Sequence, residues 1–244
     1  NRGNLFWCIL IFFFKFECKN GKVHSDMPRP KYFENDYWKY DRGDWYDIDR
    51  CTDFKTNPEI YAPDLIEMIL NSKVKHEIAC HSFSHCDFSE KNSYPELIEA
   101  ELDASEQAMR KFGVKPETFI FPANQYGNFD LLKKFGYTTI RFKSNEMKEI
   151  GYPEILTNEL VAIHDSIAID IPEEGWHTNY IVNKLKKYVD KAIAKNAICH
   201  FWFHPSVSKE CINDVMFPLF DYINKRRESS DILTLTMNEI KNFS

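Results

Sequence analysis

The residues best suited to chemistry are His81 and His85, which follow a short apolar run that begins at Glu77. A strand that finishes in a turn would place both imidazoles on one side of the chain end. Neutral imidazole is the commonest protein ligand for zinc and related ions, so the pair could hold one divalent metal. Catalytic metal sites usually supply three protein ligands, and we therefore expect a third one, a carboxylate, from elsewhere. Two polar side chains that cap a loop would show the same spacing.

Three other apolar runs, at residues 118–121, 160–163 and 197–203, are also followed by residues that could serve a site. Those residues are Pro122 and Asn124, then His164 and Asp165, and finally His200, Trp202 and His204 in or after the last run. In parallel α/β barrels the chemistry gathers where strands end. We therefore expect these side chains to converge on one face of the sheet.

Strands and helices alternate along the chain. Apolar runs predict strands at residues 6–13, 77–80, 118–121, 138–142, 160–163, 197–203 and 232–235. Helical spacing predicts helices after Pro63, from a Ser93/Glu96 capping box to residue 112, and at 129–135, 181–193 and 213–227. This alternation predicts a parallel sheet built from right-handed crossovers. No glycine-rich phosphate loop follows a strand, which favours a barrel, formed by a single domain over residues 1–244.

Composition narrows the class of protein. The chain has 244 residues, 43% of them hydrophobic, and a net charge of -6. No basic cluster exceeds residues 225–227, so nucleic acid is not an expected partner. Seven cysteines without regular spacing do not indicate a disulfide framework and favour a reducing, cytoplasmic location. The apolar run 5–14 is shorter than the ~20 residues of a membrane span, and we expect it to form a buried strand.

Residues 22–57 interrupt the regular pattern. This long excursion is rich in aromatic residues, among them Tyr37, Trp38, Tyr40, Trp45 and Tyr46. Long structured loops in compact enzymes are often functional, and flat rings could form a sugar-binding surface. The same rings could equally pin the excursion to the body of the protein.

Three motifs resemble those of the polysaccharide deacetylase family, the NodB-homology, carbohydrate esterase 4-like enzymes. Residues 77–85 look like the family's metal motif, residues 121–125 like its third motif, and residues 199–205 like its late histidine motif. They occur in the family's order, and the match runs over nearly the whole chain.

The resemblance implies a distorted (β/α)7-8 barrel that removes acetyl groups from an N-acetylated polysaccharide or sugar. By position, His81 and His85 would bind a divalent metal, zinc or else cobalt, and His204 would be the general acid. The residues implied for substrate binding are Pro122, Asn124 and Trp202. His200 lies on the same side of a regular strand as His204, so an exchange of their roles stays open.

The chain departs from the family at its first motif, where adjacent aspartates act as base and third metal ligand. No such pair precedes Leu5, so we expect an incomplete sequence in which the first strand is missing. Weaker candidates for the third ligand are Asp44, Asp47, Asp49 and Asp87. A missing first strand would leave unpaired edges at residues 6–13 and 232–235.

Two other functions stay open. A non-catalytic relative could bind carbohydrate through the aromatic excursion and a vestigial pocket. An enzyme of the same fold could instead hydrolyse small linear or cyclic amides.

Overall fold

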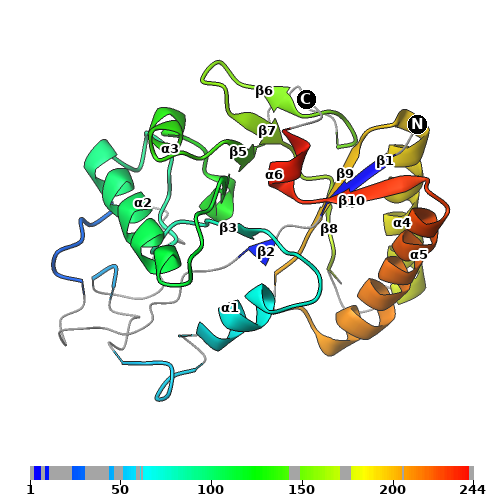
Figure 1. Ribbon diagram of the computed structural model, residues 1–244, viewed down its shortest axis with the longest axis horizontal. Coiled ribbons are helices and arrows are strands. Elements are labelled where there is room, and N and C mark those ends of the chain that lie inside the picture. Colours follow the sequence, from blue (N-terminus) through cyan, green and yellow to red (C-terminus); the bar gives the residue numbers. More distant parts are fainter. Residues whose placement is uncertain are drawn as a thin grey trace. The chain divides into compact units, whose positions relative to one another are not determined.

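The computed structural model describes residues 3–6, 9–10, 24–30, 44–46, 52–58, 61, 63–142, 149–170, 177–204 and 206–241. The chain divides into two compact units (Figure 1). The first consists of Asn1–Cys8, Arg141–Ile155 and Val161–Ser244, and the second of Ile9–Ile140 and Leu156–Leu160. The single domain over residues 1–244 stays a prediction.

The first unit contains a four-stranded parallel sheet with the order β10-β1-β9-β8. Its strands are β1 (Gly3–Phe6), β8 (Ile167–Ala168), β9 (Ile198–Trp202) and β10 (Ile232–Leu235). Gly3 lies opposite Ile232, and Asn4 lies opposite Ile198 on the other side of β1. The unpaired edge predicted at residues 6–13 is therefore wrong for β1, which pairs with β10 and β9, whereas the edge predicted at residues 232–235 agrees with the place of β10 at the end of the described sheet.

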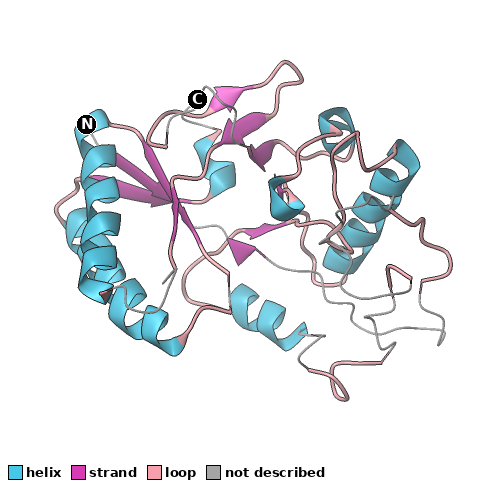
Figure 2. Cartoon of the chain, turned by 180° about the vertical axis from the view of Figure 1, so that it is seen from behind, coloured by secondary structure: helices cyan, strands magenta, loops and turns pink. Residues whose placement is uncertain are grey.

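Two helices pack against this sheet, α4 (Thr178–Lys195) and α5 (Phe217–Glu228), and they lie side by side (Figure 2). The spacing of Ile181, Leu185 and Val189 places these side chains on the buried face of α4. A π-helical turn (Cys211–Met216) leads into α5. The unit also contains a hairpin of β6 (Glu154–Ile155) and β7 (Val161–Ile163), and the short helix α6 (Met237–Ile240).

The second unit places the segment 77–80 between two other strands. Its strands are β2 (Ile9–Leu10), β3 (Ile78–Ala79), β4 (Thr118–Ile120) and β5 (Thr139–Arg141), whose last residue belongs to the first unit. β2 pairs with β3 in parallel, and Cys80 then pairs with Phe119 of β4. Its helices are α1 (Pro63–Leu70), α2 (Pro95–Arg110) and α3 (Phe129–Lys134).

The α/β class agrees with the prediction, but the closed barrel does not. Closure requires an unbroken ladder in which every strand has two neighbours. The described strands fall into separate sheets, and the order β10-β1-β9-β8 has two ends.

Helix α2 begins one residue later than its predicted capping box requires. Its N-cap is Tyr94, with φ of -147°, and Pro95 is the first helical residue. Ser93 instead donates its hydroxyl to the carbonyl of Ser89, at 2.7 Å. The capping box of Ser93 and Glu96 is therefore wrong, because proline is favoured in the first helical position and moves the start of the helix.

Two further findings concern the described residues alone. None of their helices combines the length and the apolar character needed to cross a membrane. Their cysteines, Cys80, Cys86, Cys199 and Cys211, are buried free thiols.

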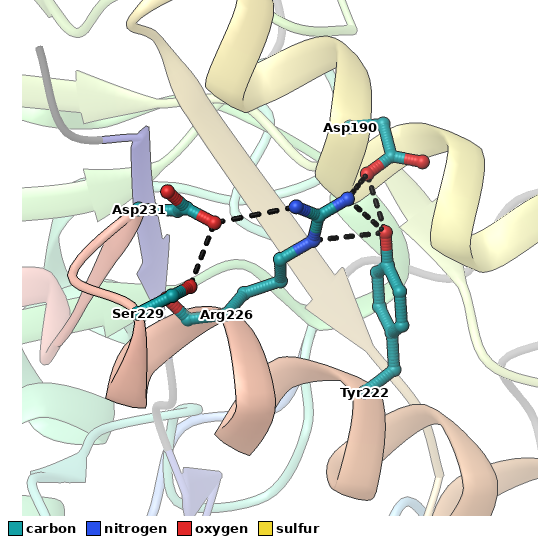
Figure 3. A network of polar contacts seen from close by, with 5 residues as sticks. All are labelled: Asp190, Tyr222, Arg226, Ser229 and Asp231. Atoms are coloured by element: carbon teal, nitrogen blue, oxygen red, sulfur yellow. Dashed lines mark hydrogen bonds and ion pairs between the residues drawn. The ribbon is translucent and has the colours of Figure 1, made fainter.

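Arg226 of α5 joins three parts of the first unit (Figure 3). Its guanidinium donates to Asp190 of α4 at 3.0 Å, to Asp231 at 3.2 Å and to the hydroxyl of Tyr222 at 2.8 Å. Ser229 also donates to Asp231, at 2.7 Å. The network fixes the end of α5 relative to α4 and to the turn that enters β10.

We predict that Arg226→Met lowers the melting temperature by roughly 2–4 °C. Methionine keeps the aliphatic stem but removes all the hydrogen bonds of the guanidinium. The control is Lys225→Met, which removes a single exposed ion pair to Asp221 in the same helix and should leave the melting temperature unchanged. Equal melting temperatures for the two variants, measured by circular dichroism, would contradict a stabilising role for the network.

Candidate functional site

His81 and His85 lie next to each other in the second unit. Their ring centroids are 4.9 Å apart and their planes are inclined by 71°. His81 follows Cys80 directly at the end of the β3 segment, and the chain then turns through positive φ values at Ser82 (64°) and His85 (61°). These two left-handed residues fold the loop back, so that both imidazoles lie together as predicted.

The ring of His81 has a defined tautomer. Its Nδ1 lies 2.7 Å from the carbonyl oxygen of Ile120, which can only accept, so the proton is on Nδ1 and the lone pair on Nε2. The pairing of Cys80 with β4 puts this carbonyl in place, since the amide of Ile120 donates to Cys80 at 2.9 Å. Metal-binding histidines typically donate their second ring nitrogen in this way. The donor chemistry of the pair therefore fits two positions of a zinc site.

A third ligand is not found in the described part of the chain, where no three His, Cys, Asp or Glu side chains gather around a common point. Asp44 accepts from Arg29 at 2.6 Å, and this bond holds the pKa of Asp44 below its usual value. Asp87 accepts from the side chain of Asn92 at 2.8 Å. The other predicted candidates, Asp47 and Asp49, lie outside the described residues. The third ligand thus stays a prediction.

A buried carboxylate holds the loop between the two histidines. Glu101 of α2 is 0% exposed and accepts from the amides of Phe83 and Ser84, at 2.9 and 2.7 Å. It also accepts from the hydroxyl of Ser84 at 2.5 Å and from that of Tyr46 at 3.4 Å. Burial raises the pKa of Glu101, whereas the bonds from Ser84 act in the opposite direction.

Glu101 was not singled out from the sequence, although a signal for it exists. It lies four residues after Leu97 and four before Ser105, on the buried face of α2. A glutamate in an apolar helical stripe is unusual because a buried charge needs partners. Its position in the stripe therefore points to a network that the sequence alone does not identify.

Two aromatic residues of the excursion pin it to this loop. Trp45 is 8% exposed and donates its Nε1 proton to the hydroxyl of Ser84 at 2.9 Å. Tyr46 is 3% exposed and reaches Glu101. A sugar-binding role is wrong for these two rings because they are buried, and the pinning role is confirmed for them. The other three, Tyr37, Trp38 and Tyr40, lie outside the described residues.

Pro122 and Asn124 form a tight 3-10 turn directly after β4. Ala123 and Asn124 have φ values of 39° and 56°, so the turn leaves the strand sharply. Pro122 is buried, whereas Asn124 is exposed. Close packing fixes the following segment, because a Cβ atom on Gly127 would lie 2.4 Å from the carbonyl oxygen of Phe88. The substrate-binding role of Pro122 and Asn124 stays a prediction.

Trp202 and His204 lie together at the end of β9 in the first unit. Their rings meet edge to face, with centroids 5.3 Å apart, and His204 is exposed. The guanidinium of Arg141 lies 5.4 Å from the centroid of the Trp202 ring, within range of a cation–π interaction. Arg141, which was not singled out from the sequence, thus lies beside the ring of Trp202.

His200 and His164 are both buried in the same unit. His200 donates from Nδ1 to the carbonyl of His164 at 3.1 Å, and His164 donates from Nε2 to that of Glu149 at 2.9 Å. Burial, together with the charge of Arg141, lowers the pKa of His200 to about 4. A buried neutral imidazole is poorly placed to exchange protons with a substrate, which favours His204 for that role.

Comparisons with known proteins confirm the resemblance found in the sequence. Residues 42–140, which include His81, His85, Pro122 and Asn124, match the family model described as polysaccharide deacetylase. No curated protein matches the chain.

Solved structures share the fold. A Mycobacterium smegmatis protein described as a polysaccharide deacetylase superposes with a TM-score of 0.59 at 17% identity, over 77% of this chain and 68% of that one. Puue allantoinase superposes with a TM-score of 0.57 at 13% identity, over 73% of this chain and 61% of that one. Sequence identities this low support a shared fold and nothing beyond it.

The pKa of His200 predicts a dependence of stability on pH. The pKa of His200 in the folded protein is about 4, below its usual value of 6.5. The contribution of the neutral His200 to the free energy of unfolding is therefore complete above pH 6.5 and is lost as the pH falls through the folded-state pKa. The complete loss corresponds to about 3 kcal/mol. We expect His200→Gln, which cannot take up the proton, to lose less stability between about pH 7 and pH 4.5.

Urea unfolding at the two pH values measures this difference. His177→Gln, at an exposed histidine, is the control and should behave like the wild type. If His200→Gln loses as much stability on acidification as the wild type, His200 is not the group responsible.

Proposed function

We propose, from its resemblance to the polysaccharide deacetylases, that this chain is a metal-dependent hydrolase that removes N-acetyl groups from a carbohydrate. The bond cleaved is a non-peptide carbon–nitrogen bond. One observation carries the proposal, namely the adjacent imidazoles of His81 and His85, with the His81 tautomer set by the carbonyl of Ile120. That arrangement falls inside the segment that matches the family model.

His81 and His85 would hold a divalent cation, zinc or else cobalt, through imidazole nitrogen. For His81 the nitrogen is Nε2, because Nδ1 carries the proton given to Ile120. Such a metal, when bound, supplies Lewis acidity that polarises an amide carbonyl and makes water more acidic. The loop that carries the histidines is held by hydrogen bonds to Glu101, so the two rings start from a fixed separation.

His204 would give a proton to the departing amine. In the overall reaction the amide C–N bond breaks, the oxygen of water joins the acetyl carbon to form acetate, and the nitrogen gains a proton. His204 is exposed and can reach a substrate, and its edge-to-face packing on Trp202 restricts the orientation of the ring. Binding of the sugar would fall to Pro122, Asn124 and Trp202.

A small-amide hydrolase is the second candidate, and the likeness in fold to an allantoinase favours it. A non-catalytic carbohydrate-binding role has less support, since Trp45 and Tyr46 are buried. We expect an N-acetylated carbohydrate as the partner and a cytoplasmic location, in keeping with the free thiols of the described cysteines.

Removal of one imidazole tests the metal site. We predict that the wild type binds ~1 equivalent of zinc per chain, and that His81→Ala loses this binding. Zinc is measured by competition with a chromophoric chelator, and acetate release is measured on N-acetylated oligosaccharides. The matched control is His177→Ala, at an exposed histidine, which should keep both.

The outcomes separate the candidates. Acetate release by the zinc-loaded wild type supports the deacetylase. Hydrolysis of a small cyclic amide without acetate release supports the second candidate. If zinc binds equally well to the wild type and to His81→Ala, the proposed metal site is wrong.

Substitution of the general acid gives an independent test. We predict that His204→Gln lowers kcat by about 100-fold or more, because no proton reaches the leaving nitrogen. Zinc affinity should not change. A full kcat in His204→Gln together with a reduced one in His200→Gln would assign the role to His200.

A further inference from the structure

The loop between His81 and His85 lacks regular structure, yet two of its amides are bonded to a single side-chain atom. The amides of Phe83 and Ser84 both donate to Oε2 of Glu101, at 2.9 and 2.7 Å. The other carboxylate oxygen, Oε1, accepts from the hydroxyl of Ser84 at 2.5 Å. Glu101 therefore contacts the centre of the loop. Neither His81 nor His85 takes part in these three bonds.

These bonds are made by the residues that lie between the two histidines in the chain. Phe83 and Ser84 lie between the two residues with positive φ, Ser82 at 64° and His85 at 61°. A left-handed backbone outside glycine is held only when the surroundings determine it. The carboxylate supplies this restraint from the middle of α2, a helix of 16 residues whose position is fixed by its buried face.

The two backbone amides require an oxygen without a proton at Oε2. An ionised carboxylate offers two oxygens and no donor, and each of its three short contacts comes from an N–H or O–H group. A glutamine could keep its oxygen toward the two backbone amides, but its NH2 group would take the place of Oε1, so the Ser84 hydroxyl would lose the acceptor for its proton. Bonds to a charged acceptor are also stronger than those to a neutral one.

Ser84 extends the network to the excursion. Its hydroxyl donates to Glu101 and accepts from Nε1 of Trp45 at 2.9 Å. Tyr46 makes a longer contact with Glu101, at 3.4 Å. The segment 44–46 and the histidine loop are thus held by the same carboxylate.

We infer that Glu101 is a positioning residue, whose carboxylate sets the separation of the His81 and His85 imidazoles and through it the affinity of the pair for a divalent cation. This inference rests on the proposed function in one respect, that a metal is what the pair binds. Partners that orient metal ligands typically change metal affinity by about 10–100-fold when they are removed.

The test compares Glu101→Gln with Glu99→Gln in the full chain. Both substitutions replace a glutamate of α2 by its amide, but Glu99 is paired with Lys134 at the surface. Zinc affinity is measured by chelator competition, and hydrogen exchange is measured at the amides of Phe83 and Ser84. Circular dichroism verifies that each variant is folded at the temperature used.

We expect Glu101→Gln to raise the dissociation constant for zinc at least about tenfold and to speed exchange at both amides. Glu99→Gln should match the wild type in both measurements. A carboxylate that only stabilised the core would lower the melting temperature but leave the zinc affinity of the folded protein unchanged. That result would overturn the inference.

Two further results keep the inference separate from the proposed function. If the wild type binds no zinc, the proposed function fails, and amide exchange at Phe83 and Ser84 still reports whether Glu101 holds the loop. If Glu101→Gln does not fold, Ser84→Ala replaces it, since it removes one of the bonds to Oε1 and should also weaken zinc binding. An unchanged zinc affinity in folded Ser84→Ala would overturn the inference.

Discussion

The buried carboxylate of Glu101 is the constraint on which the candidate metal site depends. A carboxylate with no exposed surface is stable only if its oxygens accept hydrogen bonds. Here the donors come from the loop between His81 and His85, so the same bonds satisfy the buried oxygens and hold the backbone that carries the two imidazoles. Stability and the geometry of the candidate site are therefore coupled in this loop.

The two units place their candidate site residues in contrasting environments. In the second unit, the pairing of Cys80 with β4 supplies the carbonyl that sets the tautomer of His81. In the first unit, β9 buries His200 and leaves His204 exposed. A difference of four residues in position thus separates the buried His200 of β9 from the exposed His204 that follows the strand.

Much of the fold could be predicted from periodicity and turn residues. The strand at residues 232–235 and the helices near 129–135 and 181–193 agree with the structure to within a few residues. Elements of two to four residues, such as β6, β8 and α6, were missed because they are too short to show a period. The closed barrel was not confirmed among the described strands, and strand pairing between distant segments leaves no local trace in the sequence.

The sequence by itself determined the α/β class, the candidate ligands His81 and His85, and the resemblance to the deacetylases, since residue type and local spacing carry this information. Only the tertiary structure decided that Trp45 and Tyr46 are buried, that β1 pairs with β10, and that Glu101 holds the histidine loop. Each of these depends on contacts between residues far apart in the chain. Burial and hydrogen bonding at that range are set by packing, which a linear pattern does not encode.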